Sequence, residues 1–187
     1  MSAIHEHVLQ NGMTLLCWPQ RHLHGLEFGL YLKGGPLYET EETQGISNLL
    51  EHLCFRGLGG LNREGLLREL NRFGTNLDAA TYAEGLVFRL KCLPRFFDAA
   101  LEYFLRFFAN VPWTPEQIAA EKQVVLRQLE ADGDGDLFDR AACDFRKTEN
   151  GAFPPLGTPE SLMALTEADI HLWQEMIFQP QNACLVM

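Results

Sequence analysis

The sequence predicts an α+β domain in which helices pack on one face of a mainly antiparallel β-sheet. Near the N-terminus, apolar runs flank Asn11-Gly12 within residues 7–17, the pattern of a hairpin with a two-residue turn. Strand-like and helix-like segments then follow in mixed order. The chain has 187 residues, 47% of them hydrophobic and 21% charged, which suits one buried core. We therefore expect residues 1–187 to form a single domain.

Two further strands are expected inside the chain and one at its end. Residues 25–32 alternate apolar with small or polar side chains and stop at Gly34. Residues 80–90 end in a period-2 stretch that is rich in strand-forming residues. Residues 182–187 have the composition of the beginning of a strand, and an apolar strand is an unusual place for a chain to stop. We therefore expect the domain to be truncated at its C-terminal end.

The helices are recognised by their apolar spacing and their end signals. Leu66, Leu67 and Leu70 recur at helical spacing, and Gly74 stands where a C-terminal cap is wanted. The aromatic residues of 93–109 form a wide apolar stripe, which we interpret as core because few basic residues interleave it. The helical segments are residues 45–55, 62–73, 93–109 and about 114–131, with further starts at Thr158 and Thr166.

Composition excludes several classes of function. A formal net charge of −10 leaves no basic footprint for nucleic acid. No apolar run approaches the roughly 20 residues of a membrane-spanning helix, and residues 1–10 lack the basic start and apolar stretch of a signal peptide. The five cysteines include no C-x-x-C pair, which favours reduced thiols over disulfides. We therefore expect a cytoplasmic protein that binds neither nucleic acid nor membrane.

One helical segment carries a chemical pattern, Asn48-x-x-Glu51-His52. Side chains at positions i, i+3 and i+4 of a helix share one face, so two metal ligands and a carboxylate base can meet there. The pattern resembles the H-x-x-E-H helix of the pitrilysin/insulinase-type (inverzincin) zinc peptidases. An aromatic residue, a basic residue and a glycine follow at 55–57, as they do in that family.

Three later segments resemble the same family in the same order. Residues 70–81 resemble the glycine and N-A-x-T stretch that leads into the family's substrate-pairing edge strand. Residues 121–128 resemble E-x-x-V-V-L-x-E, whose last glutamate is the family's third zinc ligand, and residues 156–170 resemble the stretch that closes the domain. The resemblance covers residues 9–187, which makes it far more specific than the helix motif alone.

The resemblance implies a role for each matching residue. Glu51 matches the general base, and His52 matches the second zinc-binding histidine. Asn48 stands at the position of the first histidine, and Gln128 stands at the position of the glutamate ligand. Glu121 matches an acidic position that assists catalysis.

The two carboxamides change what this motif can bind. Zinc sites are built from imidazole, thiolate and carboxylate groups, whereas a carboxamide is neutral and a poor donor. We therefore expect no zinc cofactor at this degenerate motif, and no water activated by it. One hypothesis is that Asn48 and Gln128 hydrogen-bond across the site and brace it in place of a metal.

The architecture implied by the resemblance is one half of a metallopeptidase of the pitrilysin/LuxS-like type. Two similar halves of such a peptidase enclose a peptide chamber, and the substrate adds as an extended strand to a sheet edge near the catalytic helix. In this chain the substrate-binding edge is expected at Asp78, Ala79, Ala80 and Thr81.

Three functional hypotheses follow from the resemblance. The first is a non-catalytic peptidase-like domain that binds peptide or pairs with an active homologue, as a second half or as a heterodimer subunit. The second is a working zinc endopeptidase with unusual ligands, in which Glu51 is the general base and His52 and Glu121 hold the metal. The third is a scaffold within a larger complex.

Three weaker motifs are interpreted as structural. The Asp-Gly-Asp-Gly-Asp run at 132–136 lacks the glycine and the glutamate that complete a calcium loop, so a solvated loop is expected. Residues 57–60 lack the lysine and hydroxyl of a phosphate-binding loop and are expected to form a turn. The His-x-His pairs at 5–7 and 22–24 are expected to be exposed to solvent.

Overall fold

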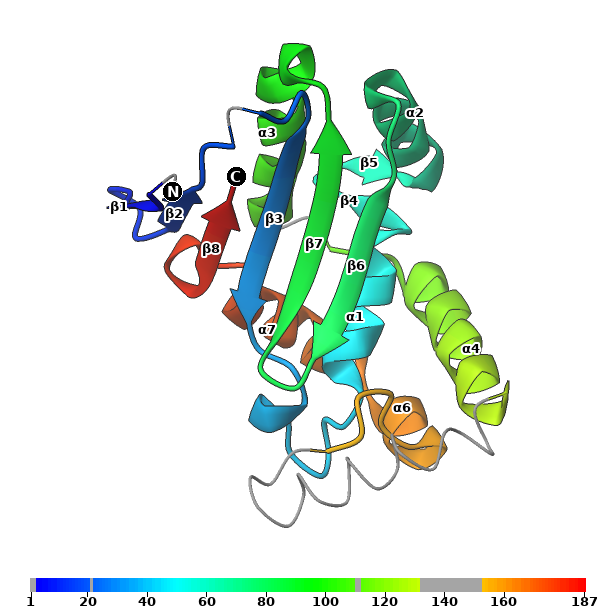
Figure 1. The fold of residues 1–187 in the computed structure, drawn as a ribbon. Helices are drawn as coiled ribbons and strands as arrows, with labels where there is room; N and C mark the ends of the chain where they lie inside the picture. Colours follow the sequence, from blue (N-terminus) through cyan, green and yellow to red (C-terminus); the bar gives the residue numbers. More distant parts are fainter. Residues whose placement is uncertain (1–2, 21, 110–111, 132–152) are drawn as a thin grey trace.

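The computed structural model describes residues 3–20, 22–109, 112–131 and 153–187. The described strands form a six-stranded sheet in the order β1-β2-β8-β3-β7-β6 (Figure 1). Every neighbouring pair is antiparallel except β2 and β8. The strands are β1 His5–Val8, β2 Thr14–Cys17, β3 Leu26–Lys33, β6 Leu77–Tyr82, β7 Gly85–Cys92 and β8 Ala183–Val186.

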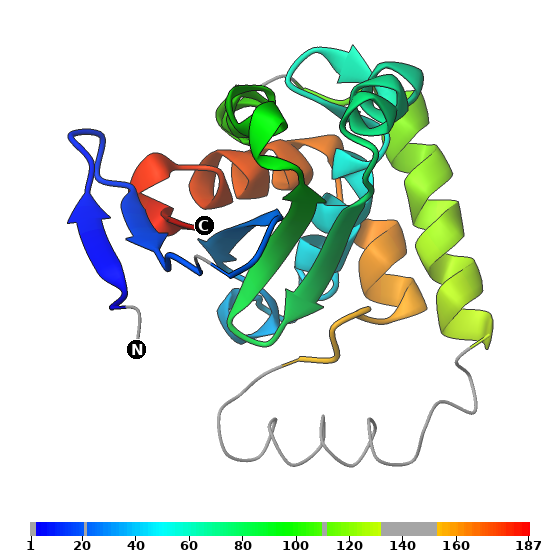
Figure 2. The same cartoon turned by 45° about the horizontal axis from the view of Figure 1, so that its top comes forward.

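Helices cover one face of this sheet. Helices α1, α3 and α7 lie on the same side of it in Figures 1 and 2, and no helix of the described residues covers the other side. Helix α1 contacts β6, and α3 contacts β7. The predicted α+β class is confirmed. The helices are α1 Ile46–Cys54, α2 Arg63–Phe73, α3 Phe97–Leu105, α4 Pro115–Ala131, α6 Pro159–Ala164 and α7 Glu167–Ile177.

Short elements join these layers. Only residues 59–60 of the turn expected at 57–60 form a connection, because Gly57 and Leu58 belong to a strand of a small hairpin in which Leu58 pairs with Leu61. The hairpin strands are β4 Gly57–Leu58 and β5 Leu61–Asn62, and short 3₁₀ helices lie at Pro36–Tyr38, Pro94–Phe96, Arg106–Phe108 and Pro180–Asn182.

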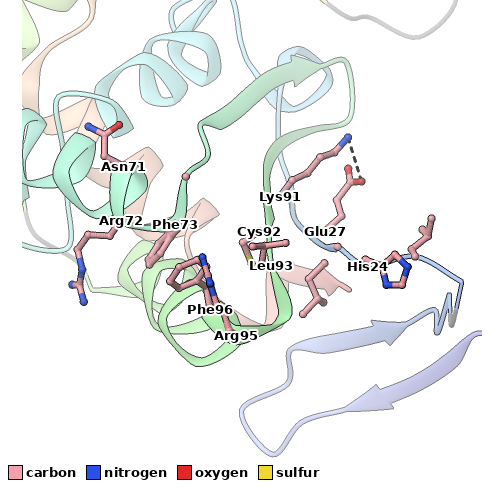
Figure 3. A pocket seen from close by; sticks show the side chains of 14 residues that line it. His24, Glu27, Asn71, Arg72, Phe73, Lys91, Cys92, Leu93, Arg95 and Phe96 are labelled. Carbon is pink, nitrogen blue, oxygen red and sulfur yellow. Dashed lines mark ion pairs between the residues drawn. The ribbon is translucent and has the colours of Figure 1, made fainter.

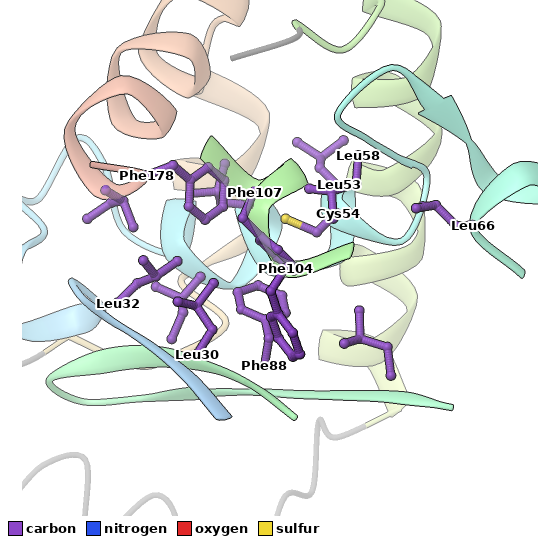
Figure 4. Packing of buried hydrophobic residues seen from close by; sticks show 14 of the residues in the cluster. Leu30, Leu32, Leu53, Cys54, Leu58, Leu66, Phe88, Phe104, Phe107 and Phe178 are labelled. Carbon is purple, nitrogen blue, oxygen red and sulfur yellow. The ribbon is translucent and has the colours of Figure 1, made fainter. Parts of the chain in front are cut away.

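Buried and exposed side chains alternate along β3 and β7, so one side of each strand faces the core. Leu30 and Leu32 are each 1% exposed, whereas Tyr31 between them is 41% exposed. The register places Leu30 opposite Phe88. The ring centroid of Phe88 lies 4.4 Å from that of Phe107, so the aromatic segment packs against the sheet as core, as predicted (Figure 4).

The last strand lies inside the sheet. Strand β8 pairs in parallel with β2, where Cys184 lies opposite Thr14, and antiparallel with β3, where Leu185 lies opposite Leu30. Leu185 is only 5% exposed. The strand predicted at residues 182–187 is therefore confirmed, and it connects the N-terminal hairpin to the rest of the sheet.

The N-terminal hairpin has a longer loop than predicted. Val8 pairs with Thr14, which leaves five residues between the strands, so the prediction of a two-residue turn is wrong. Asn11 and Gly12 still form a turn, since Asn11 Oδ1 accepts a hydrogen bond from Met13 N and Gly12 has φ +87°. Met13 is buried in the core at 3% exposure, so the loop widens to bring its side chain inward.

The segment predicted as one strand at 80–90 consists of two. Strands β6 and β7 form an antiparallel hairpin in which Tyr82 pairs with Gly85. A Cβ atom on Gly85 would lie 2.6 Å from the carbonyl oxygen of Leu32, so the close approach of β3 requires glycine there. The single-strand prediction is wrong because the chain reverses direction at residues 83–84, between Tyr82 and Gly85.

Helix ends follow their local sequence signals. Asn62 Oδ1 accepts from Gly65 N at the start of α2, and Gly74 ends that helix in the left-handed conformation. Thr158 and Thr166 each form a capping box, at the starts of α6 and α7. These predicted starts and stops are confirmed.

Other expectations have simple outcomes. Cys17, Cys54, Cys92 and Cys184 are free thiols. No described helix combines the length and the apolar character needed to cross a membrane. The expected solvated loop at 132–136 lies outside the described residues.

Candidate functional site

The motif residues of helix α1 lie on a different side of the helix from its buried leucines. Leu49, Leu50 and Leu53 are fully buried on its core side. Asn48, Glu51 and His52 share a second side, and α1 contacts both β6 and α4. The site therefore lies where the motif helix, the edge strand and helix α4 meet.

Glu51 connects the motif helix to the edge strand. Thr81 Oγ1 on β6 donates a 2.5 Å hydrogen bond to Glu51 Oε2, and Glu51 is only 9% exposed. Burial raises the pKa of the Glu51 carboxyl group, although the Thr81 hydrogen bond and the charge of His52 oppose this shift. The expected base is therefore held by a hydroxyl group from the predicted substrate strand.

His52 on α1 faces Glu121 on α4. His52 Nδ1 lies 3.6 Å from Glu121 Oε1, and Arg56 Nε donates a 2.5 Å hydrogen bond to Glu121 Oε2. Burial raises the pKa of the Glu121 carboxyl group, but hydrogen bonds and positive charge from His52 and Arg56 outweigh it, so the net shift is downward. Glu121 is thus a buried carboxylate engaged on both oxygens.

The two carboxamides do not bridge the site. Asn48 is 9% exposed, and its Oδ1 has no hydrogen-bond partner among the described residues. Gln128 is exposed on α4, about 10 Å along the helix axis from Glu121. The hypothesis that Asn48 and Gln128 brace the site through a mutual hydrogen bond is wrong. The other motif residues find different partners, Thr81 for Glu51 and Glu121 for His52.

These donors do not fit a zinc ion. His52 supplies the imidazole at a matching ligand position, whereas Asn48 and Gln128 supply neutral amides. Glu121 is already paired with Arg56. Within the part of the chain that is described, no three His, Cys, Asp or Glu side chains gather in a metal-binding cluster. Asn48, whose Oδ1 has no described hydrogen-bond partner, occupies the position at which zinc binding would require an imidazole, thiolate or carboxylate ligand.

The predicted substrate segment lies on an edge strand. Asp78, Ala79, Ala80 and Thr81 belong to β6, which stands at the end of the sheet order and pairs with β7. The other backbone edge of β6 is therefore available to an added strand, as far as the described residues show. Thr81 also places this edge beside Glu51.

Two contacts around the motif helix are not evident from the sequence. Arg56 was noted only as the basic residue after the motif, yet it is the nearest cation to Glu121. Glu39 was not singled out, yet its carboxylate accepts from Gly45 N and Ser47 N at the start of α1. The basic residue that follows the motif could have indicated the role of Arg56. No sequence pattern near Glu39 indicates its contacts with the start of α1.

The fold and the motif helix together are those of one half of a zinc-peptidase-type protein, in which an edge strand runs beside the motif helix. The sequence model of Insulinase (Peptidase family M16) matches residues 24–142. This chain belongs to that family.

Curated relatives are similar over part of their length. An uncharacterized zinc protease of Rickettsia felis is 28% identical over 162 residues, which cover 85% of this chain and 39% of that protein. The mitochondrial-processing peptidase subunit beta of Caenorhabditis elegans is 26% identical, over 76% of this chain and 32% of that protein. The chain therefore spans less than half the length of these relatives.

Solved structures share the fold. A protease from Helicobacter pylori superimposes with a TM-score of 0.90 at 22% identity, covering 99% of this chain and 46% of that one. The peptidase M16 inactive domain from Pseudomonas fluorescens gives a TM-score of 0.85 at 16% identity, covering 98% and 46%. At these identities the comparison shows the fold alone.

Proposed function

We propose that this chain is a non-catalytic M16-family domain that binds an extended peptide along β6 and pairs with a homologous peptidase half. The observation that carries the proposal is the donor set at the motif. A carboxamide replaces the first histidine, a second carboxamide replaces the glutamate ligand, and Asn48 Oδ1 is buried without a partner.

The remaining acidic residues support this proposal. Glu51 is held by Thr81, and Glu121 is held by Arg56 and His52. Each carboxylate therefore stabilises contacts between elements, and freeing either one for catalysis would break such a contact.

Peptide binding and pairing rest on different features. The available edge of β6 offers backbone hydrogen bonds to any extended chain, which is the usual mode of β-augmentation. The curated relatives are more than twice as long as the matched segment, and one of them is by name a subunit of a processing peptidase. A second half, or a partner subunit, would supply the rest of such an assembly.

Metal content tests the loss of zinc. Wild type and the double variant Asn48→His, Gln128→Glu are purified without metal, exposed to equal zinc, gel-filtered and analysed by mass spectrometry for metal. We expect far less than one zinc per wild-type chain and a clear gain in the double variant, because the two missing donors are restored. Stoichiometric zinc in the wild type that is lost in His52→Ala would contradict the proposal. Proteolysis abolished by Glu51→Gln would then favour the active endopeptidase.

Hydrogen exchange tests the peptide-binding edge. An unstructured peptide should slow amide exchange in β6 and leave β1 unchanged, although β1 forms the opposite edge of the same sheet. Equal effects on both edges, or none, would count against binding at β6. Co-purification with a homologue that has an intact H-x-x-E-H motif tests the pairing.

A further inference from the structure

A pocket lies at the end of the sheet where β3 begins and β7 ends. Its volume is about 600 Å³, within the range of small-ligand sites. The C-terminus of α2 and the Pro94–Phe96 turn form its other walls (Figure 3). None of the motif residues on α1 lines it, so it is separate from the site described above.

The floor of this pocket is apolar. Phe73 and Phe96 stand side by side with ring centroids 6.0 Å apart, and Phe73 is only 5% exposed. Cys92 also lines this pocket (Figure 3), and burial raises the pKa of its thiol, so the sulfur is neutral and behaves as an apolar group. The floor can therefore accept an aromatic or branched aliphatic group.

The rim is cationic, although the whole chain has a net charge of −10. Arg72, Lys91 and Arg95 line the pocket against one carboxylate, Glu27. Lys91 is paired with Glu27 at 3.5 Å, and Arg72 is paired with a glutamate of its own helix. Arg95 instead lies over the Phe96 ring, 4.8 Å from its centroid, and no described carboxylate pairs with it.

The position of Arg95 suits recognition of a carboxylate. Stacking on a ring holds the guanidinium plane in place while its N–H groups on the edge remain free to donate. These donors match the two oxygens of a carboxylate, which Arg can bind in bidentate fashion. A neutral or cationic ligand would leave this cation without a partner.

We propose that this pocket binds a carboxylate that is carried next to an apolar side chain, with Arg95 on the carboxylate and Phe73 and Phe96 against the apolar group. Such a ligand is either a small free acid or the C-terminal residue of a peptide. One guanidinium on an apolar floor suits a single carboxylate better than a polyphosphate, which needs several donors.

Calorimetric titration with matched probes tests this proposal. The small probes are N-acetyl-phenylalanine and its amide, and the larger ones are an unstructured peptide ending in phenylalanine and the same peptide amidated. We expect each acid to bind about tenfold more tightly than its amide, the value of one charge-assisted contact. Binding of both acids would allow either source, and binding of the peptide acid alone would identify a peptide C-terminus.

Variants identify the contact. Arg95→Gln should remove the preference for the acid, whereas Arg127→Gln, at an exposed position on α4 outside the pocket, should retain it. Unchanged circular dichroism and thermal unfolding would show that both variants are folded. Equal affinity for acid and amide, no binding of either acid, or an unchanged preference in Arg95→Gln would overturn the proposal. The proposed function stands or falls separately, because the two sites share no residue.

Discussion

Glu39 shows how one buried carboxylate organises the start of the motif helix. Its oxygens accept hydrogen bonds from Gly45 N at 2.8 Å and Ser47 N at 3.0 Å, which satisfies amide groups that the first turn of a helix leaves unpaired. Burial raises the pKa of the Glu39 carboxyl group above its ordinary value of 4.5, despite these hydrogen bonds. The folded state therefore favours the protonated form more than the unfolded chain does.

The raised pKa of Glu39 should make the stability of the protein depend on pH. From pH 4.5 up to the raised folded pKa, the folded state binds more protons than the unfolded chain, so the contribution of Glu39 falls as the pH rises. We expect the unfolding free energy of the wild type minus that of Glu39→Gln to decrease between pH 4.5 and 7 in urea titrations. The same comparison with Glu41→Gln, at an exposed neighbouring position, serves as the control. A difference that grows with pH would refute the expectation.

At the scale of residues, the sequence indicates which side chains stand at the motif positions but not which contacts they make. Asn48 and Gln128 were recognisable because the motif spacing fixes their positions along helices. The bond from Arg56 to Glu121 joins residues 65 positions apart, and the bond from Thr81 to Glu51 joins residues 30 apart. Such pairs depend on how elements pack, which no local pattern encodes.

At the scale of elements, Arg56, just after the end of helix α1, forms an ion pair with Glu121 on helix α4. Arg56→Met removes the cation that lies 2.5 Å from Glu121 and leaves a carboxylate that is 8% exposed without its nearest partner. We expect a loss of about 1–3 kcal/mol in unfolding free energy, because a buried charge without its partner retains its desolvation cost. Chemical denaturation at pH 7 measures this loss.

Arg68→Met provides the matched control for that variant. Arg68 pairs with Glu64 within α2, where both side chains are more than 70% exposed. Surface pairs of this kind contribute little, so we expect a change below about 0.5 kcal/mol. Similar losses in the two variants would show that the Arg56–Glu121 pair contributes no more to stability than a surface pair.

Elements with local signals were predicted and elements set by tertiary packing were not. The capping threonines Thr158 and Thr166 fix helix starts within a few residues of sequence, so both were found. The wider first hairpin loop goes together with the burial of Met13 in the core, and the start of β7 at Gly85 goes together with the close approach of β3. Neither influence comes from neighbouring residues in the chain.

At the scale of the whole molecule, the first and last strands of the chain occupy different places in the sheet. Strand β1 lies at an edge, whereas β8 lies between β2 and β3. Removing residues 183–187 deletes a central strand and leaves β2 and β3 without a shared neighbour. We expect this truncation to abolish cooperative thermal unfolding. Removing residues 1–8 deletes β1, an exposed edge strand, and should lower the melting temperature by only about 2–4 °C. Calorimetry measures the thermal unfolding of both truncated proteins. Equal decreases in melting temperature would contradict the prediction.

The placement of β8 also governs the order in which the domain can assemble during synthesis. Strand β2 finds its parallel neighbour only when residues 183–186 have left the ribosome, although β2 itself emerges among the first twenty residues. The N-terminal hairpin therefore has no neighbouring strand in the sheet while β3, β6, β7 and the helices are being synthesised and fold. During that interval the open side of β3 is an unpaired strand edge, and a chaperone that binds extended segments would protect the nascent chain there.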